Sequence, residues 1–279
     1  MPEIVVLMPA FNEARIITYS LRSIINQSIK PSLIIVCDNG SSDGTPEIAK
    51  KVLNESGIDY LVLGVRRYPE LGKYNINIVY HACANQSMRY GADYVAIIES
   101  DTVLERHYFK KLIDAFDKDG RLGMASGRIM TFSGHEIILD PFPLPRNYVG
   151  LPGSARVYRG ECWRELNTRF SILRLPAWDT DHAVLITLLG WRIAKINDAV
   201  AYTRPDRPFK GFYKGVIDAM HGLPMAWALY RAISRFDPDY LIGYLKCLIN
   251  DCSEGTYKEL KLMYELGFKN VLKQALNHI

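Results

Sequence analysis

The first hundred residues alternate between short unbroken apolar runs and segments in which apolar residues recur every three or four positions. The runs are rich in β-branched side chains and predict strands that are buried on both faces: Ile4–Met8, Leu33–Cys37, Tyr60–Val65 and Tyr94–Ile98. The periodic segments between them predict amphipathic helices with one face toward the core. Because strand and helix alternate in this order, we expect right-handed crossovers and a parallel sheet.

The pattern is looser after Asp101. An amphipathic segment predicts a helix from near Glu105, and residues 133–156, with four prolines, predict a long irregular loop of the kind that forms a lid or binding wall. Further short elements are expected at Leu122–Ser126, Gly160–Leu166, Arg192–Ile196 and Ala199–Thr203. From Phe209 onward the pattern is helical, so residues 1–208 are expected to form one α/β domain and residues 209–279 a helical extension.

Composition narrows the class of protein. The 279 residues are enough to bury a sizeable core, and 48% hydrophobic with 23% charged residues is ordinary for a soluble globular protein. The net charge of +4 suits an acidic ligand such as a nucleotide diphosphate, but it is too weak to favour nucleic acid as a partner.

Cysteine usage and the N-terminus favour a cytoplasmic protein. Cys37 and Cys83 lie in apolar segments, so we expect buried thiols in a reducing compartment, while a bond between Cys247 and Cys252 stays open. The chain begins directly with a strand pattern, so no signal peptide is expected. No uncharged apolar run is long enough to span a membrane.

Polar side chains follow three of the predicted strands, in the loops Pro9–Glu13, Asp38–Thr45 and Glu99–Asp101. The carboxyl ends of parallel strands share one edge of a sheet, where ligands of open α/β folds bind. Glu99 and Asp101 offer hard oxygen ligands for Mg²⁺ or Mn²⁺; alternatively, they form a surface turn in which Asp101 caps a helix.

The first two loops predict a flat apolar slot suited to a nucleobase. Asp38, at its edge, can accept a hydrogen bond from a ring N–H, and we prefer this interpretation to a role in the turn. For Asp43 we prefer turn formation and helix capping, and Asn12 is expected to cap the helix that follows the first loop.

Four motifs together resemble the family 2 glycosyltransferases of the GT-A fold: PAFNE (9–13), CDNGSSDGT (37–45), ESDTVL (99–104) and WDTD (178–181). The resemblance extends from about Ile4 to Pro205. It implies an α/β fold with a mostly parallel central sheet flanked by helices. The nucleotide-sugar half would be about 1–102 and the acceptor half about 103–208, followed by the helical C-terminal extension.

The resemblance also implies roles for single residues. It places Pro9, Ala10, Phe11 and Glu13 along a nucleoside pocket, Asp38 at the base, and Glu99, Ser100 and Asp101 at the donor, with Asp101 holding Mn²⁺ or Mg²⁺. Lys73 matches a position near the nucleotide; it is either a diphosphate contact or a solvated loop lysine.

The expected reaction moves a sugar from a UDP- or GDP-sugar to a hydroxyl of a glycan or lipid-linked acceptor. A metal assists departure of the nucleotide diphosphate, and a carboxylate takes the proton of the acceptor hydroxyl. The position that matches the family's base is Asp179, and a single displacement there inverts the anomeric configuration. The alternative is that Asp179 or Asp181 simply caps a helix.

The sequence departs from the family pattern at several positions. Glu99 replaces the usual Asp, and Trp178 replaces the usual Glu, where an indole could stack on a sugar or a lipid. No His occurs near Tyr202-Thr203, which weakens any second metal ligand there. Arg204 is a candidate cation for the diphosphate, or a surface residue beside a Pro turn.

Three other classes of protein are alternatives to a glycosyltransferase. A Rossmann oxidoreductase is disfavoured because the first loop has no GxGxxG, and a nucleotidyltransferase because it has no Gly-rich basic loop. A non-catalytic nucleotide-sugar-binding module stays open because of the departures at Glu99 and Trp178. The C-terminal helices mix aromatic and cationic residues; we favour packing on the core or on a second subunit of a homo-oligomer over peripheral contact with a membrane.

Overall fold

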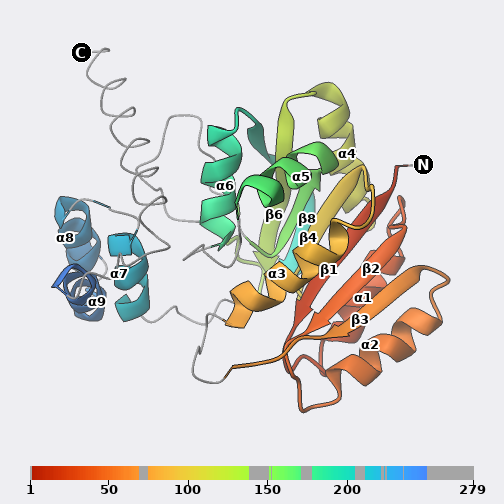
Figure 1. The fold of residues 1–279 in the computed structure, drawn as a ribbon, viewed down its shortest axis with the longest axis horizontal. Coiled ribbons are helices and arrows are strands. Elements are labelled where there is room, and N and C mark those ends of the chain that lie inside the picture. Colours follow the sequence, from red (N-terminus) through yellow and green to blue (C-terminus); the bar gives the residue numbers. More distant parts are fainter. Residues whose placement is uncertain are drawn as a thin grey trace. The chain divides into compact units, whose positions relative to one another are not determined.

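The computed structural model describes residues 2–68, 75–137, 151, 153–170, 178–204, 211–220, 223, 225–234 and 236–249. The chain forms two compact units (Figure 1). The first unit contains the described residues up to Arg204, and the second contains those from Gly211 onward. The predicted domain boundary at 208 lies outside the described residues.

The first unit is built on one sheet, whose described strands run in the order β3-β2-β1-β4-β7-β6-β8-β5. Their bounds are β1 (Ile4–Ala10), β2 (Leu33–Asp38), β3 (Asp59–Gly64), β4 (Tyr94–Ile98), β5 (Val103–Leu104), β6 (Leu122–Thr131), β7 (Ala155–Arg159) and β8 (Arg192–Thr203). The strands β3, β2, β1 and β4 are parallel, as predicted.

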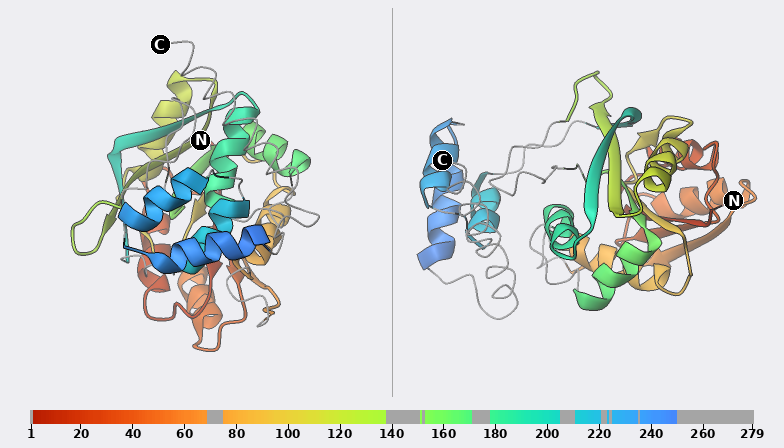
Figure 2. Two further views of the ribbon diagram at one scale, coloured as in Figure 1. Left: turned by 90° about the vertical axis from the view of Figure 1, so that its left-hand side faces the viewer. Right: turned by 90° about the horizontal axis from the view of Figure 1, so that it is seen from above.

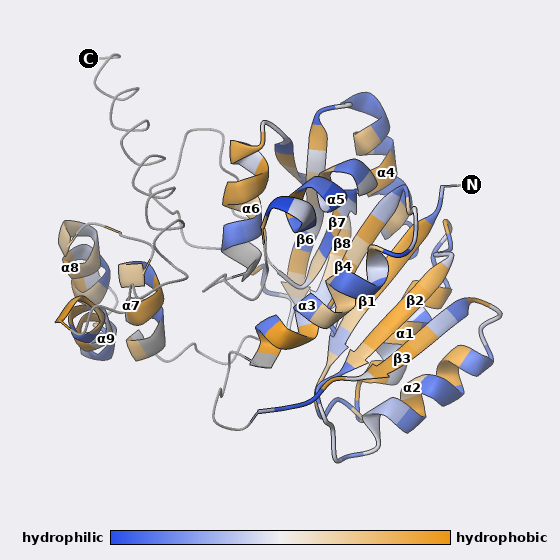
Figure 3. Ribbon diagram, in the orientation of Figure 1, coloured by the Kyte–Doolittle hydropathy of each residue, from blue (hydrophilic) through white to orange (hydrophobic). Residues whose placement is uncertain are grey.

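The parallel half of the sheet forms the centre of the core. Every residue of β1, β2 and β4 is buried, and these strands are hydrophobic along nearly their whole length (Figure 3). The predicted first strand, Ile4–Met8, is too short, since Pro9 pairs with Cys37 and the strand continues to Ala10. A proline near the end of a strand removes only one N–H from the ladder.

The other half of the sheet is mixed. β7 is antiparallel to β4 and to β6, whereas β8 is parallel to β6. Sequence reasoning missed β7 because Arg156 and Arg159 interrupt its apolar pattern, although four of its five residues are buried. The two short strands expected between Arg192 and Thr203 are one strand with a register shift opposite Gly127/Arg128.

Helices cover both faces of the sheet (Figures 1 and 2). They are α1 (Ile17–Ile25), α2 (Thr45–Asn54), α3 (Asn75–Ser87), α4 (Tyr108–Lys118), α5 (Gly160–Arg169) and α6 (Trp178–Leu188). One core cluster joins alternate strand residues, such as Val6 and Met8, to α1, α2 and α4. α3 and α5 lie on the opposite face (Figures 1 and 2).

A disulfide between Cys37 of β2 and Cys83 of α3 ties that helix to the sheet, with Cα atoms 6.1 Å apart. The prediction of buried thiols at these two positions is therefore wrong. Both residues are buried, as expected, but a pair on different elements leaves no spacing signal in the sequence. Cys252 lies outside the described residues, so its pairing with Cys247 stays untested.

The helix starts differ from those expected. Asn12 does not cap α1, whose N-cap is Ile16. α4 begins at Tyr108, and the short strand β5 separates it from Asp101, so Asp101 caps no helix there. The WDTD motif forms the first turn of α6.

The second unit contains α7 (Gly211–Met220), α8 (Met225–Ser234) and α9 (Pro238–Ile249). Asp218, fully buried, pairs with Arg231 and accepts a hydrogen bond from the Tyr240 hydroxyl at 2.7 Å. Large apolar side chains of α8 and α9, such as Ile233 and Ile249, are exposed. The expectation that these helices pack on the core or on a second subunit, in preference to a membrane, stays a prediction. Among the described residues, no helix is long and apolar enough to cross a membrane.

Candidate active site

A pocket of about 210 Å³ lies where the three polar loops meet, at the carboxyl ends of β1, β2 and β4. It is lined by Pro9, Ala10, Phe11, Glu13, Asn39, Ile76, Val79, Tyr80, Glu99, Ser100 and Asp101. The structure thus brings together seven of the residues predicted from the first and third loops. The second loop contributes Asn39, the residue after Asp38.

The first two loops are joined by hydrogen bonds that begin at Asn12. The Asn12 N–H donates to Ser41 Oγ, and the Ser42 N–H donates to Asn12 Oδ1, both at 2.9 Å. Asn12 has a φ of 56°, a left-handed conformation that Asn tolerates better than most residues. Its side chain therefore links two loops, which explains why it does not cap α1.

Thr45 and Asp43 complete this connection. The Glu13 N–H donates to Thr45 Oγ1 at 2.8 Å, and the Ala14 N–H donates to Asp43 Oδ2 at 3.0 Å. The Thr45 hydroxyl donates in turn to Asp43 Oδ1, and this bond is the largest cause of the lowered pKa of Asp43. Asp43 stabilises the loop, in agreement with the preferred interpretation.

Asp38, at the end of β2, has one carboxylate oxygen that accepts hydrogen bonds and one without a hydrogen-bond partner among the described residues. Its Oδ2 accepts the N–H groups of Gly40 and Ser41 at 3.1 and 3.0 Å. Its Oδ1 is buried and has no hydrogen-bond partner among the described residues. A buried acceptor without a partner is unfavourable unless a ligand supplies a donor. Asp38 thus has the property expected of a residue that binds a base N–H.

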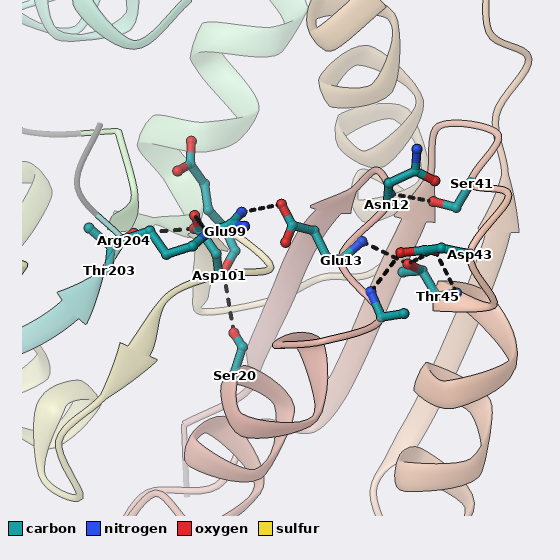
Figure 4. Close-up of polar contacts among 11 residues, drawn as sticks. Asn12, Glu13, Ser20, Ser41, Asp43, Thr45, Glu99, Asp101, Thr203 and Arg204 are labelled. Atoms are coloured by element: carbon teal, nitrogen blue, oxygen red, sulfur yellow. Dashed lines mark hydrogen bonds and ion pairs between the residues drawn. The ribbon is translucent and has the colours of Figure 1, made fainter. Parts of the chain in front are cut away.

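Asp101 follows β4, and both of its carboxylate oxygens are engaged (Figure 4). Oδ1 accepts a hydrogen bond from the Thr203 hydroxyl at 3.2 Å, and Oδ2 accepts one from Arg204 Nε at 3.0 Å. Arg204 also pairs with Glu13 through its other nitrogen, so one guanidinium bridges two pocket carboxylates. β8 therefore supplies two residues at its end that hold Asp101.

The pKa values in this cluster follow from burial and pairing. Burial raises the pKa of Glu13, the charges of Asp101 and Asp43 raise it further, and Arg204 opposes the rise. For Arg204, burial lowers the pKa, but the hydrogen bond to Asp101 and the charges of Asp101 and Glu13 outweigh it, so the net shift is upward. The guanidinium stays charged.

The turn that carries Glu99 and Asp101 is held against α1. The Ser20 hydroxyl contacts the carbonyl oxygens of Thr102 at 2.6 Å and of Glu99 at 3.3 Å. The Tyr80 hydroxyl of α3 lies 3.4 Å from Glu99 Oε1. Neither Ser20 nor Tyr80 was predicted as a site residue.

The α3 residues of the pocket were missed for a physical reason. Ile76, Val79 and Tyr80 are spaced three and four residues apart, a pattern typical of any helix face that packs on a core. Arg67 was also missed; its guanidinium lies 3.8 Å from the centre of the Phe11 ring, a cation–π contact at the pocket wall.

Three predicted site residues lie beyond what the structure describes. Lys73 is outside the described residues, and so are the side chains of Trp178 and Asp179. The backbone places Trp178 and Asp179 in the first turn of α6, within the first unit. Their roles stay predictions.

The donor set fits a divalent cation that arrives with a nucleotide. The described residues contain no group of three or more His, Cys, Asp or Glu that could hold a metal alone. Mg²⁺ and Mn²⁺ with nucleotides need only one or two carboxylates, because phosphate oxygens and water complete the shell. Glu13, Glu99 and Asp101 outnumber the described cations at the pocket, Arg204 and Arg67, so a diphosphate needs added positive charge here.

The fold and this site define an α/β protein with a pocket at the carboxyl ends of its parallel strands, where open α/β folds bind their ligands. Residues 5–137 match the family model described as Glycosyl transferase family 2. This match identifies residues 5–137 as a family 2 glycosyltransferase domain, as the motifs in this part of the chain predict.

Curated relatives agree with this assignment. The chain is 26% identical over 122 residues to a poly-beta-1,6-N-acetyl-D-glucosamine synthase of Staphylococcus aureus (strain COL). The match covers 43% of this chain and 27% of that protein, so the chain spans about a quarter of the length of such relatives.

Solved structures show the same fold. TarS 1–349 of S. aureus, in complex with UDP, superposes with a TM-score of 0.58 at 17% identity, covering 78% of this chain and 63% of that one. The mannosyltransferase PcManGT of Pyrobaculum calidifontis, in complex with GDP-Man and Mn²⁺, gives 0.55 at 17% identity, covering 95% and 84%. The predicted fold class is confirmed.

Proposed function

We propose that this chain moves a sugar from a UDP- or GDP-sugar to a hydroxyl of a glycan or lipid-linked acceptor. The observation that most supports this is the convergence of the first loop, the Asp38 loop and Asp101 around one pocket. Structures with the same fold contain UDP, UDP-GlcNAc or GDP-Man, which agrees with a nucleotide-sugar donor.

In this proposal, the nucleoside occupies the slot formed by Pro9, Ala10 and Phe11. Asp38 Oδ1 accepts the ring N–H of the base, which removes the cost of its buried, unpartnered state. Both uracil and guanine carry such an N–H beside a carbonyl, so this contact alone does not select between UDP and GDP.

The diphosphate lies toward Asp101, which would hold Mn²⁺ or Mg²⁺. A divalent cation there acts as a Lewis acid that stabilises the charge of the departing diphosphate. Arg204, fixed beside Asp101, supplies a further positive charge, and Lys73 is proposed to do the same.

The transfer is a single displacement. The acceptor oxygen forms a bond to the anomeric carbon as the bond from that carbon to the phosphate oxygen breaks, and the configuration inverts. Asp179 takes the proton of the acceptor hydroxyl as general base. Its place in the first turn of α6 favours the ionised carboxylate through the helix dipole.

Ligand-dependent stability tests the donor half of the proposal. We expect UDP or GDP with Mn²⁺ to raise the melting temperature of the wild type, and Asp101→Ala to abolish the metal-dependent part of the rise. Asp114→Ala removes an exposed carboxylate of α4 and serves as the matched control. A Mn²⁺-dependent shift that persists in Asp101→Ala contradicts the assignment of the metal ligand.

Nucleotide release tests the chemistry. We expect release of UDP from UDP-GlcNAc, or of GDP from GDP-mannose, to rise in the presence of glycan or lipid-linked acceptors that carry a free hydroxyl. Asp179→Asn should lower turnover by about 10²-fold or more while donor binding is retained. Binding without turnover in the wild type would favour the non-catalytic module instead.

A further inference from the structure

The carboxylate assigned to the metal is already paired with a fixed cation. Arg204 Nε donates to Asp101 Oδ2 at 3.0 Å, and Thr203 occupies Oδ1 (Figure 4). The Asp101 side chain is only 19% exposed, although that of Arg204 is 45% exposed, so the guanidinium pairs with a carboxylate that is largely shielded from water. A divalent ion at Asp101 must therefore compete with a guanidinium for the same oxygen.

Glu13 holds the same guanidinium from the other side. It pairs with Arg204 through Oε1, and its side chain is only 16% exposed. Because Glu13 N–H is bonded to Thr45, its backbone is fixed by the loop connection described above. Arg204 is thus tethered to the first loop independently of Asp101.

A guanidinium binds phosphate oxygens in the same forked geometry in which it binds carboxylates. When a diphosphate enters the pocket, it offers Arg204 a partner with more negative charge than Asp101. When the guanidinium turns to the diphosphate, Asp101 Oδ2 becomes available to a metal ion. A divalent cation near Asp101 repels the guanidinium and so favours the same movement toward the diphosphate.

We propose that Arg204 is a built-in counter-ion that competes with the divalent metal for Asp101, and that nucleotide binding resolves this competition. In the nucleotide-free protein, Arg204 pairs with Asp101 and disfavours metal. With nucleotide bound, Arg204 pairs with the diphosphate, and metal binds Asp101. Glu13 is the positioning residue that keeps Arg204 at the pocket in both states. This inference rests on the proposed function.

The proposal makes metal and nucleotide binding cooperative through Arg204, and such coupling is reciprocal. It is measured by titrating Mn²⁺ without nucleotide and with saturating UDP, following free Mn²⁺ by electron paramagnetic resonance. The ratio of the two dissociation constants is the coupling factor. Direct coordination of the metal by phosphate contributes to the coupling factor in every variant. The informative quantity is therefore the difference in coupling factor between the wild type and the variant.

In Arg204→Gln, we expect nucleotide-free protein to bind Mn²⁺ about threefold to tenfold more tightly than the wild type. The metal then no longer has to displace the charged hydrogen bond from Arg204 to Asp101, and the expected gain corresponds to the free energy of such a bond. The coupling factor should fall by at least about threefold. Arg204→Lys, which keeps the charge, should lie between the two proteins. Arg121→Gln changes an exposed arginine that does not line the pocket and serves as the matched control.

A second measurement separates a contact with the diphosphate from a general effect of charge. In EDTA, Arg204→Gln should weaken UDP binding by about threefold or more, while uridine, which lacks phosphates, should bind equally to both proteins. Glu13→Gln should weaken UDP binding in the same test without affecting uridine, since the guanidinium is no longer held at the pocket.

Two results overturn the inference without contradicting transfer from a nucleotide-sugar, although the second also removes the metal assigned to Asp101. One is an equal gain in Mn²⁺ affinity with and without UDP in Arg204→Gln, which would be through-space electrostatics only. The other is wild-type protein that binds UDP but no Mn²⁺ in either state, so that Arg204 alone neutralises the diphosphate. Wild-type protein that binds neither UDP nor GDP under any condition overturns the proposed function itself.

Discussion

Asp38, which precedes the pocket residue Asn39, and Asp101, which lines the pocket, differ in what they can offer a ligand. Asp38 has one oxygen fixed by backbone N–H groups and another with no partner among the described residues. Asp101 has both oxygens engaged, by Thr203 at the end of β8 and by Arg204, the next residue. An acceptor at Asp38 is therefore present before any ligand binds, whereas Asp101 must exchange a partner.

His182, three residues after Asp179, is fully buried on α6. Its Nδ1 lies 3.1 Å from the Tyr158 hydroxyl, and its ring packs edge-on against Tyr158 and Trp163. Burial and the nearby charge of Arg156 lower the pKa of His182 to about 3, although Asp181 opposes the shift. The imidazole is neutral in the folded protein.

This burial predicts a pH dependence of stability. In the unfolded chain His182 takes up a proton near pH 6.5, but in the folded protein only near pH 3. Stability that is complete above pH 6.5 is therefore lost as pH falls through this window, by about 2 kcal/mol at pH 5. Urea unfolding at pH 7.5 and pH 5 measures the loss.

His182→Asn should be less stable at pH 7.5 but should lose less stability between the two pH values. His107→Gln changes an exposed histidine and is the control. Equal losses in the wild type and in His182→Asn would show that other groups cause the acid sensitivity.

At the scale of elements, α3 is the wall of the pocket that depends on a covalent bond. It contributes Ile76, Val79 and Tyr80, and Cys83 on the same helix is bonded to Cys37 of β2. The residue after Cys37 is Asp38, so the disulfide joins the strand that ends at Asp38 to the opposite wall of the pocket.

We expect reduction of this disulfide to destabilise the first unit. Its cysteines are 46 residues apart in sequence, and closing a loop of that length stabilises by about 4 kcal/mol through chain entropy. Differential scanning calorimetry with and without a phosphine reductant should show a lower melting temperature when the reductant is present.

The double variant Cys37→Ala/Cys83→Ala should melt at the same temperature with and without reductant. Cys162→Ala removes a buried thiol that is not in a disulfide and should keep the reductant effect. If wild-type protein shows no change on complete reduction, the bond contributes no stability.

At the scale of the whole molecule, the chain separates into two units with their own cores. The helices α7 and α9 of the second unit pack so closely that a Cβ on Gly243 would lie 1.9 Å from the Phe212 carbonyl oxygen. A side chain there forces the two helices apart.

Gly243→Ala should therefore destabilise the second unit by about 1–3 kcal/mol. Limited proteolysis should cleave residues 211–249 faster, while UDP affinity of the first unit is retained. Gly120→Ala, where an added Cβ meets open space, is the control. Loss of UDP binding in Gly243→Ala, with the first unit still folded, would show that the two units depend on each other.

Local pattern was enough to predict the parallel strands and the three loops at their ends, because buried runs and polar strand ends are sequence-local features. It could not predict partners that are distant in the chain. Arg204 meets Asp101 across 103 positions and Glu13 across 191. The same limit applies to Cys37 and Cys83, and to β7, whose buried Arg156 contradicts the usual composition of a core strand.

Hydrogen bonds between the first loop, at Asn12 and Glu13, and the Asp38–Thr45 loop fix the two sides of the slot proposed for the base. The conformational entropy of these loops is lost during folding, so ordering them adds no further entropy cost when a ligand binds. Association with a nucleoside should therefore be a one-step encounter, with an observed rate that rises linearly with ligand concentration and shows no slow isomerisation phase.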